Sequence, residues 1–271
     1  MFLQLIYTGL RISLTSKKRA ILIRILLLWV LLCIMGCYKP VKYPELDPAL
    51  IPARQIKAGM SVEKRPIEYH VIGKGPEVIL IMSAIHGDEP AGIPIVEQLA
   101  EYLRQSRQGF LNGRTVVLLP FANPDGIAKN TRYNANGVDL NRNFATKNRI
   151  NNEKYGLAPL SEPESYIISQ IIRQYKPDRI VSIHQPYACI DYDGPGQMLA
   201  GHMARYCDLP IKKLGASPGS LGSYAGETLG IPTITFEMQE IDSDLEPRVL
   251  WHKYGQALLA AIIYPESVEY K

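Results

Sequence analysis

The sequence is poor in the features that mark several large classes of protein. No uninterrupted apolar run approaches the roughly 20 residues that a membrane-spanning helix needs. Internal repeats and low-complexity tracts are absent, which excludes repeat architectures. Four cysteines in 271 residues do not make a disulfide framework: Cys33 lies in the N-terminal segment and Cys37 directly after it, which leaves Cys189 and Cys207 for the folded domain. The hydrophobic fraction of 46% and the charged fraction of 21% fit one ordinary globular domain.

Acidic residues are absent from positions 1–36, and this absence explains the formal net charge of +4. The segment holds five basic residues, so the rest of the chain carries 25 bases against 26 acids. No basic stripe remains that would favour nucleic acid. We therefore expect no nucleic-acid partner.

Residues 1–36 show the order of features of a signal or anchor segment. Basic "KKRAILIR" leads into apolar "ILLLWVLLCIM" (25–35), and a small residue, Gly36, stands directly before Cys37. This order resembles the bacterial lipobox and favours lipidation of Cys37 over the alternative, an uncleaved anchor. Tyr38 rather than an aspartate follows the cysteine, which by the same resemblance favours the outer membrane. We expect a domain anchored to a membrane in the cell envelope and facing the periplasm.

From residue 59 onward, short apolar runs alternate with amphipathic stretches. A proline-rich tether is predicted for 37–58, and a folded domain for 59–271. Strands are expected at 77–82, 115–120, 179–184 and 231–237, and helices over 93–105, 162–175 and 245–263. Strands that alternate with helices indicate an α/β sheet covered on both faces.

Polar residues with metal-binding chemistry follow the strand at 77–82. His86 and Glu89 stand three residues apart on a turn that enters a helix, so both side chains can face one ion. His184 ends another predicted strand, and sites in open α/β sheets form at these carboxyl ends. Two histidines and one glutamate are the ligand set of many catalytic zinc sites, with a fourth position left for water. Because H-x-x-E alone arises by chance, this assignment depends on its companions.

The companions are present in order along the chain. "NPDG" (123–126) precedes the polar loop "TRYNANGVDLNRNF" (131–144), and "VSIHQP" (181–186) holds the lone strand-end histidine. "ITFEMQ" (234–239) places Glu237 in an apolar strand, where a carboxylate is unusual. A role as general base beside a metal would explain it.

These five motifs together resemble the zinc metallocarboxypeptidases of the carboxypeptidase A-like type over nearly all of residues 65–265. The resemblance implies a mixed, largely parallel central sheet with helices on both faces and one Zn²⁺ per chain. It also implies a role for each matching residue: zinc ligands His86, Glu89 and His184; general base Glu237; carbonyl-polarising Arg132; carboxylate-binding Asn141 and Arg142; and Asp139, which orients the first zinc histidine.

A second likeness concerns the substrate. "PGSLGS" (218–223) and "HQPYACIDYDGPG" (184–196) resemble a compact subgroup of this family that cuts peptidoglycan stem peptides between γ-D-glutamate and meso-diaminopimelate. The likeness implies a peptidoglycan-derived peptide as substrate, bound in part by Ser220 and Ser223.

Other functions stay open at this point. A general zinc carboxypeptidase or an N-acyl amino acid deacylase would use the same chemistry, although the complete "GVDLNRNF" favours a peptidase. A non-catalytic cell-wall-binding lipoprotein is the remote alternative, and the presence of Glu237 with all three ligands argues against it. The sequence leaves the oligomeric state open, as well as the choice between free tripeptide and intact wall.

Overall fold

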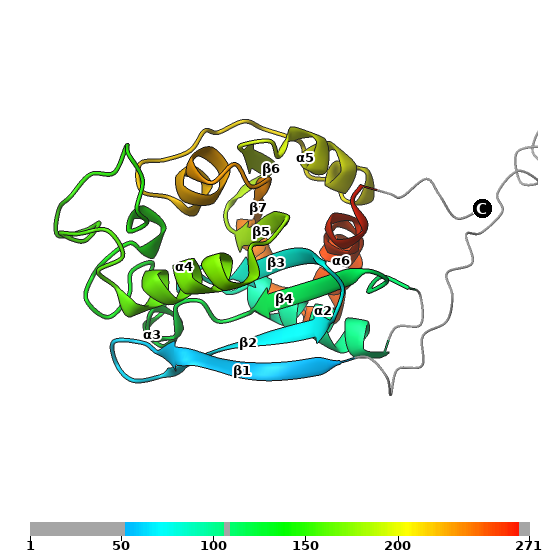
Figure 1. Cartoon of the computed structure of the whole chain (residues 1–271), viewed down its shortest axis with the longest axis horizontal. Coiled ribbons are helices and arrows are strands. Elements are labelled where there is room, and N and C mark those ends of the chain that lie inside the picture. Colours follow the sequence, from blue (N-terminus) through cyan, green and yellow to red (C-terminus); the bar gives the residue numbers. More distant parts are fainter. Residues whose placement is uncertain (1–51, 106–108, 266–271) are drawn as a thin grey trace, which may run out of the picture. The chain divides into compact units, whose positions relative to one another are not determined.

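The structure is a computed structural model of the chain, and it describes residues 52–105 and 109–265. Within them a seven-stranded sheet has the strand order β1-β2-β4-β3-β5-β7-β6 (Figure 1). The strands are β1 (Ala53–Met60), β2 (Pro66–Gly73), β3 (Glu77–Ser83), β4 (Arg114–Leu119), β5 (Arg179–His184), β6 (Tyr187–Asp193) and β7 (Thr233–Gln239). The helices are α2 (Gly92–Gln105), α3 (Pro124–Lys129), α4 (Pro163–Tyr175), α5 (Gln197–Met203) and α6 (Pro247–Ile263). Short helical turns are η2 (Leu140–Arg142), η3 (Ala204–Tyr206), η4 (Gly222–Thr228) and η5 (Glu240–Asp244).

The centre of the sheet is parallel and its edges are antiparallel. Strands β4, β3, β5 and β7 run in one direction, while β2 with β1 at one edge and β6 at the other edge pair in antiparallel fashion. The central strands are apolar and rich in β-branched residues because both of their faces are buried. Their carboxyl ends therefore meet along one edge of the core.

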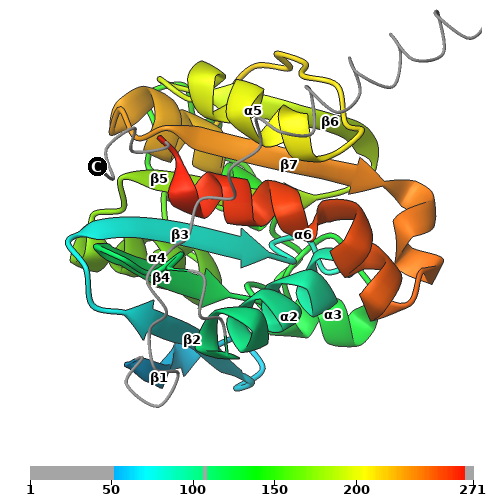
Figure 2. The same cartoon turned by 90° about the vertical axis from the view of Figure 1, so that its right-hand side faces the viewer.

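Helices cover both faces of this sheet (Figure 2). On one face α2, α5 and α6 pack against the strands through one apolar cluster, which includes Ile81, Leu99 and Leu258. On the other face α4 packs through a second cluster, which includes Leu80 and Ile168. The predicted fold class is thus confirmed, with the antiparallel edges as the part that the alternating pattern did not reveal.

The predicted tether ends earlier than expected. Strand β1 begins at Ala53, so the last part of the 37–58 segment belongs to the sheet and not to a tether. Ile56 and Ala58 pack against the cluster around α4, while most other side chains of this edge strand stay exposed or half-buried. An edge strand buries little, which leaves it only a faint hydrophobic pattern.

Several predictions on the N-terminal part lie outside the described residues. These are the signal or anchor segment at 1–36, the lipidation of Cys37 and the tether up to residue 51. In the part of the chain that is described, no helix is both long and apolar enough to cross a membrane. Cys189 and Cys207 are both free thiols.

Candidate active site

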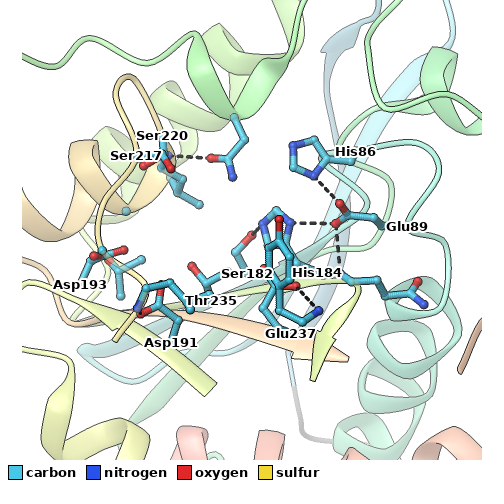
Figure 3. Close-up of a pocket in the computed structure, with 18 of the residues that line it drawn as sticks. His86, Glu89, Ser182, His184, Asp191, Asp193, Ser217, Ser220, Thr235 and Glu237 are labelled. Atoms are coloured by element: carbon cyan, nitrogen blue, oxygen red, sulfur yellow. Dashed lines mark hydrogen bonds and ion pairs between the residues drawn. The ribbon is translucent and has the colours of Figure 1, made fainter. Parts of the chain in front are cut away.

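Three predicted ligands meet in one place at the carboxyl ends of the parallel strands. Nδ1 of His86 lies 2.7 Å from Oε1 of Glu89, and Nδ1 of His184 lies 2.9 Å from Oε2 of the same carboxylate. All three side chains are buried, and one donor atom from each lies within 4.8 Å of the other two. Figure 3 shows the three side chains pointing toward one another. Among the described residues, this is the group of histidine, cysteine and acidic side chains that could hold a metal ion.

The backbone explains why residues so far apart in sequence converge. The loop from β3 to α2 turns at His86, whose carbonyl accepts the amide of Glu89 at 3.3 Å. β5 lies directly beside β3, in parallel register, and His184 is its last residue. The Gln185 amide also donates to Oε2 of Glu89 at 3.2 Å, so the glutamate is held from both strands.

The second nitrogen of each imidazole is held by a neighbour. Nε2 of His86 lies 3.1 Å from Oδ1 of Asp139, and Nε2 of His184 lies 3.0 Å from the Ser182 hydroxyl. Burial opposes a charge on His86, but the contacts with Asp139 and Glu89 outweigh it and raise the histidine pKa. Such partners fix ring orientation and leave Nδ1 of each ring for the ion, as in many zinc sites. Two imidazole nitrogens, one carboxylate and their oriented partners therefore fit Zn²⁺.

Glu237 lies level with His184 in the neighbouring strand. The two residues are partners in the parallel pairing of β5 with β7, so both side chains leave the same face of the sheet. The carboxylate is buried, and among the described residues it accepts a long hydrogen bond of 3.4 Å from the Tyr187 backbone amide. Burial raises the pKa of Glu237. The side chain lines a cavity of about 340 Å³ that the three metal-ligand candidates also line.

The polar loop at 131–144 brings positive charge to this cavity. Nε of Arg132 donates to Oδ2 of Asp139 at 2.9 Å, and its Nη1 lies 3.4 Å from Oε1 of Glu89. Asp139 thus braces both His86 and Arg132, one with each oxygen. The guanidinium is about one-third exposed and can reach a substrate in the cavity.

Asn141 and Arg142 line the same cavity beside the loop at 217–220. Oδ1 of Asn141 accepts the Leu221 amide at 2.8 Å, and the side-chain nitrogen of Asn141 has no hydrogen-bond partner among the described residues. Gly219 has a φ of +70°, and a Cβ there would lie 2.3 Å from the Arg142 carbonyl oxygen. This close contact requires glycine and fixes the two loops against each other.

The two serines predicted to bind substrate lie in different places in the structure. Ser220 lines the cavity, as does Ser217. Ser223 is buried away from it, where its hydroxyl accepts Nδ2 of Asn148 at 2.9 Å. Residues 222–228 form a helical turn, η4, which begins between the two serines, so Ser220 lies before it and Ser223 lies within it, against Asn148. The sequence likeness treated both serines as parts of one extended loop.

The "NPDG" motif supports the site without lining it. The Asn123 amide group caps α3 by accepting the Gly126 amide at 2.9 Å, and it donates to the carbonyl of Ile85 at 3.3 Å, next to His86. Asp125 points the other way, into the turn between β1 and β2.

The sequence did not predict the residues that form the floor of the cavity. Asp191 and Asp193 on β6 and Thr235 on β7 line it, together with Ser182 on β5. A usable signal was present, since "CIDYD" (189–193) sets its two acids two residues apart, as expected for one face of a strand. The stretch was interpreted as a motif after His184, not as a strand.

Comparison with known families agrees with this geometry. The zinc carboxypeptidase family model matches residues 50–201, which is more than half of the chain. The chain belongs to the zinc carboxypeptidase family and is a zinc-dependent hydrolase. Glu237 lies beyond the matched residues, and the strand register alone places it beside the ligand candidates.

Within the family, the chain is similar to murein peptide amidase A. It is 35% identical to that protein of Escherichia coli (strain K12) over 183 residues, which cover 61% of this chain and 72% of the relative. Identity to murein peptide amidase A of Vibrio campbellii is 33% over 184 residues, covering 61% and 71%.

Solved structures show the same fold. The crystal structure of a murein-tripeptide amidase from Escherichia coli O157 superimposes with a TM-score of 0.61 at 26% identity, covering 85% of this chain and all of that chain. Carboxypeptidase A from Helicoverpa armigera superimposes with a TM-score of 0.67 at 21% identity, covering 79% and 70%, and supports the fold alone.

Proposed function

We propose that this zinc hydrolase cleaves the amide bond between γ-D-glutamate and meso-diaminopimelate in peptidoglycan stem peptides. The observation that carries the proposal is one cavity, which the three metal-ligand candidates, Asn141 and Arg142 line together with hydroxyl and carboxylate side chains. Such groups suit a polar substrate side chain, because an aromatic or aliphatic one would leave them unpaired. The relatives named murein peptide amidase A support the same substrate class.

The residues divide the chemistry among themselves. Zinc held by such ligands supplies an activated water and a Lewis acid for the carbonyl oxygen. The Glu237 carboxylate would take a proton from the water whose oxygen adds to the carbonyl carbon, and would return it to the amine nitrogen as the C–N bond breaks. The Arg132 guanidinium stabilises negative charge that develops on the carbonyl oxygen. The free amide nitrogen of Asn141 and the Arg142 guanidinium bind the carboxylate of the residue that is released.

The direct test is to incubate the zinc-loaded protein with L-Ala-γ-D-Glu-meso-diaminopimelate and to identify the products by mass spectrometry. We expect release of meso-diaminopimelate, and a slower reaction with the same tripeptide ending in lysine. A site built to pair with a polar group rejects an analogue that lacks it, because its own groups stay unpaired.

Other outcomes would separate the alternatives. Equal rates with the diaminopimelate and lysine peptides would reduce the assignment to a general zinc carboxypeptidase. Hydrolysis of N-acyl amino acids in preference to both would favour a deacylase. Binding of wall fragments without any hydrolysis would favour the non-catalytic lipoprotein.

The location is a separate part of the proposal. Lipidation of Cys37 would hold the domain at the outer membrane, facing the periplasm, where stem peptides are within reach. Labelling cells with a fatty-acid analogue should mark the wild-type chain and fail to mark Cys37→Ser, which should accumulate as an uncleaved precursor. A wild-type chain without label would support a plain N-terminal anchor instead.

A further inference from the structure

The sheet face under the cavity carries its polar side chains in rows. Strands β5, β7 and β6 are adjacent, and residues paired across them point to the same side. Alternate residues along each strand then repeat the pattern at a spacing of about 6.7 Å. The first row is His184, Glu237 and Cys189; the second is Ser182, Thr235 and Asp191; the third is Ile180, Thr233 and Asp193. The second row therefore lies one step along the cavity from the proposed reaction centre.

Asp191 in the second row is buried and only partly satisfied. Its exposed fraction is 4%, and Oδ1 accepts the Leu214 amide at 2.9 Å. Among the described residues, Oδ2 of Asp191 has no hydrogen-bond partner, and neither does the hydroxyl of Thr235 in the same row. Both residues line the cavity, and Figure 3 shows them at its floor, away from His86. A buried carboxylate with a free oxygen is costly unless a ligand completes its shell.

Asp193 in the third row differs from Asp191 because it has a cation of its own. Nζ of Lys213 lies 2.8 Å from Oδ1 of Asp193, and it also donates to the Tyr192 carbonyl. This pair is nearly neutral, so the negative charge left over at this end of the cavity is that of Asp191. A substrate carboxylate would be repelled there, while a substrate ammonium would be attracted.

We propose that Asp191, with the Thr235 hydroxyl beside it, binds the side-chain ammonium of the residue that the enzyme releases. The inference rests on the proposed function and adds a contact for the distal ammonium, which diaminopimelate and lysine share. From the α-carbon of diaminopimelate or lysine to its distal nitrogen there are five bonds of about 1.5 Å, an extended reach of about 6 Å. That reach matches the step of about 6.7 Å from the first row to the second.

Four tripeptides that differ only in the last residue test the proposal. Meso-diaminopimelate carries a distal ammonium and carboxylate, lysine the ammonium alone, 2-aminopimelate the carboxylate alone, and norleucine neither. Affinities are measured by calorimetry on the full-length, zinc-loaded Glu237→Gln protein, in which the peptides should bind without turnover. We expect loss of the ammonium to weaken binding about 10- to 100-fold, the usual worth of a hydrogen bond to a charged group. Diaminopimelate should thus exceed 2-aminopimelate, and lysine should exceed norleucine.

The matched variant is Asp191→Asn, added to Glu237→Gln, because asparagine keeps the acceptor for the Leu214 amide and removes the charge. We expect the preference for ammonium-bearing peptides to fall to near unity. Asp208→Asn removes an exposed acid that does not line the cavity and should leave the preference unchanged. Circular dichroism and thermal melts of each variant check that the fold is kept.

The outcomes separate the inference from the proposed function. Equal binding of all four peptides, no binding of any, or a preference that survives Asp191→Asn would overturn the inference. Ammonium-selective binding that Asp191→Asn abolishes, combined with no cleavage by the wild-type enzyme, would keep the subsite and sink the proposed reaction. Cleavage of stem peptides at rates that do not depend on the ammonium would support the proposed reaction and overturn the ammonium subsite.

Discussion

Two buried carboxylates of this chain, Asp125 and Glu237, differ in what surrounds them. Asp125 is fully buried and accepts the Ser61 hydroxyl at 2.7 Å, the Glu63 amide at 2.9 Å and Nη1 of Arg65 at 2.6 Å. Glu237 is nearly as buried, yet it accepts one long hydrogen bond, from Tyr187.

The pKa values of the two groups move in opposite directions. Burial alone would raise both, and it does raise the pKa of Glu237. At Asp125 the Glu63 amide, the Ser61 hydroxyl and the Arg65 guanidinium outweigh burial and lower the pKa. Hydrogen bonding and not depth therefore separates a carboxylate that stabilises the fold from one that is kept available for chemistry.

Replacing Glu237 by glutamine should have the largest effect on activity. The proton acceptor is lost while the shape and the three zinc-ligand candidates are kept, so kcat should fall roughly 10²- to 10⁴-fold. Zinc content, measured by mass spectrometry of the metal, should stay at one per chain, whereas His184→Ala should lose the metal as well. Near-normal turnover by Glu237→Gln would mean that another group is the base.

Substitution of the two arginines of the cavity should affect different kinetic constants, kcat for Arg132 and KM for Arg142. Arg132 lies beside Glu89 and is proposed to stabilise charge that exists only in the transition state, so Arg132→Ala should lower kcat roughly 100-fold. Arg142 is proposed to hold the terminal carboxylate in the ground state as well, so Arg142→Ala should act mainly on KM. Steady-state kinetics on the diaminopimelate tripeptide decide this. Equal effects of both variants on kcat alone would contradict the division.

Asp125→Asn should affect stability more than catalysis. Loss of the charge-assisted hydrogen bonds should cost about 1–3 kcal/mol of unfolding free energy, with kcat nearly unchanged. Because the folded pKa of Asp125 is lowered, its stabilisation is present above the ordinary aspartate pKa and is lost as pH falls through the folded value. Urea unfolding at pH 7 should therefore show the full difference, which should shrink below about pH 4. A difference that grew on acidification would refute the assignment.

The sequence predicted the parts of the site that depend on strong local patterns. Continuous apolar runs located the parallel strands, and their carboxyl ends located His86 and His184, because sheet geometry brings those ends together. Family likeness supplied the loop that holds Asp139, and the structure sets that residue 3.1 Å from His86 as expected.

The misses arose where tertiary pairing outweighs local pattern. β1 is an edge strand without a fully buried residue, and β6 is an edge strand that places two acids, Asp191 and Asp193, at buried positions, so neither strand shows a clear apolar pattern. Missing β6 concealed Asp191, which reaches the cavity only because that strand pairs with β7. Ser223 was misplaced because a helical turn begins at Gly222, between the two serines, and the Ser220 hydroxyl accepts the Ser223 amide there at 3.1 Å.

The smallest predicted effect compares two serine hydroxyls of one segment, one that faces the cavity and one that is used within the fold. The Ser220 hydroxyl lines the cavity and accepts the Ser223 amide at 3.1 Å, which leaves its proton to donate to a substrate, while the Ser223 hydroxyl accepts Nδ2 of Asn148. Ser220→Ala should raise KM for the diaminopimelate tripeptide roughly three- to tenfold, the worth of one neutral hydrogen bond. Ser223→Ala should leave kcat/KM within about twofold, and its loss should appear as lower stability, because the Asn148 amide would remain unpaired. Parallel kinetics and thermal melts of the two variants measure both effects. If Ser223→Ala raised KM as much as Ser220→Ala, the loop would have to rearrange on binding, and both hydroxyls would then count among the substrate contacts.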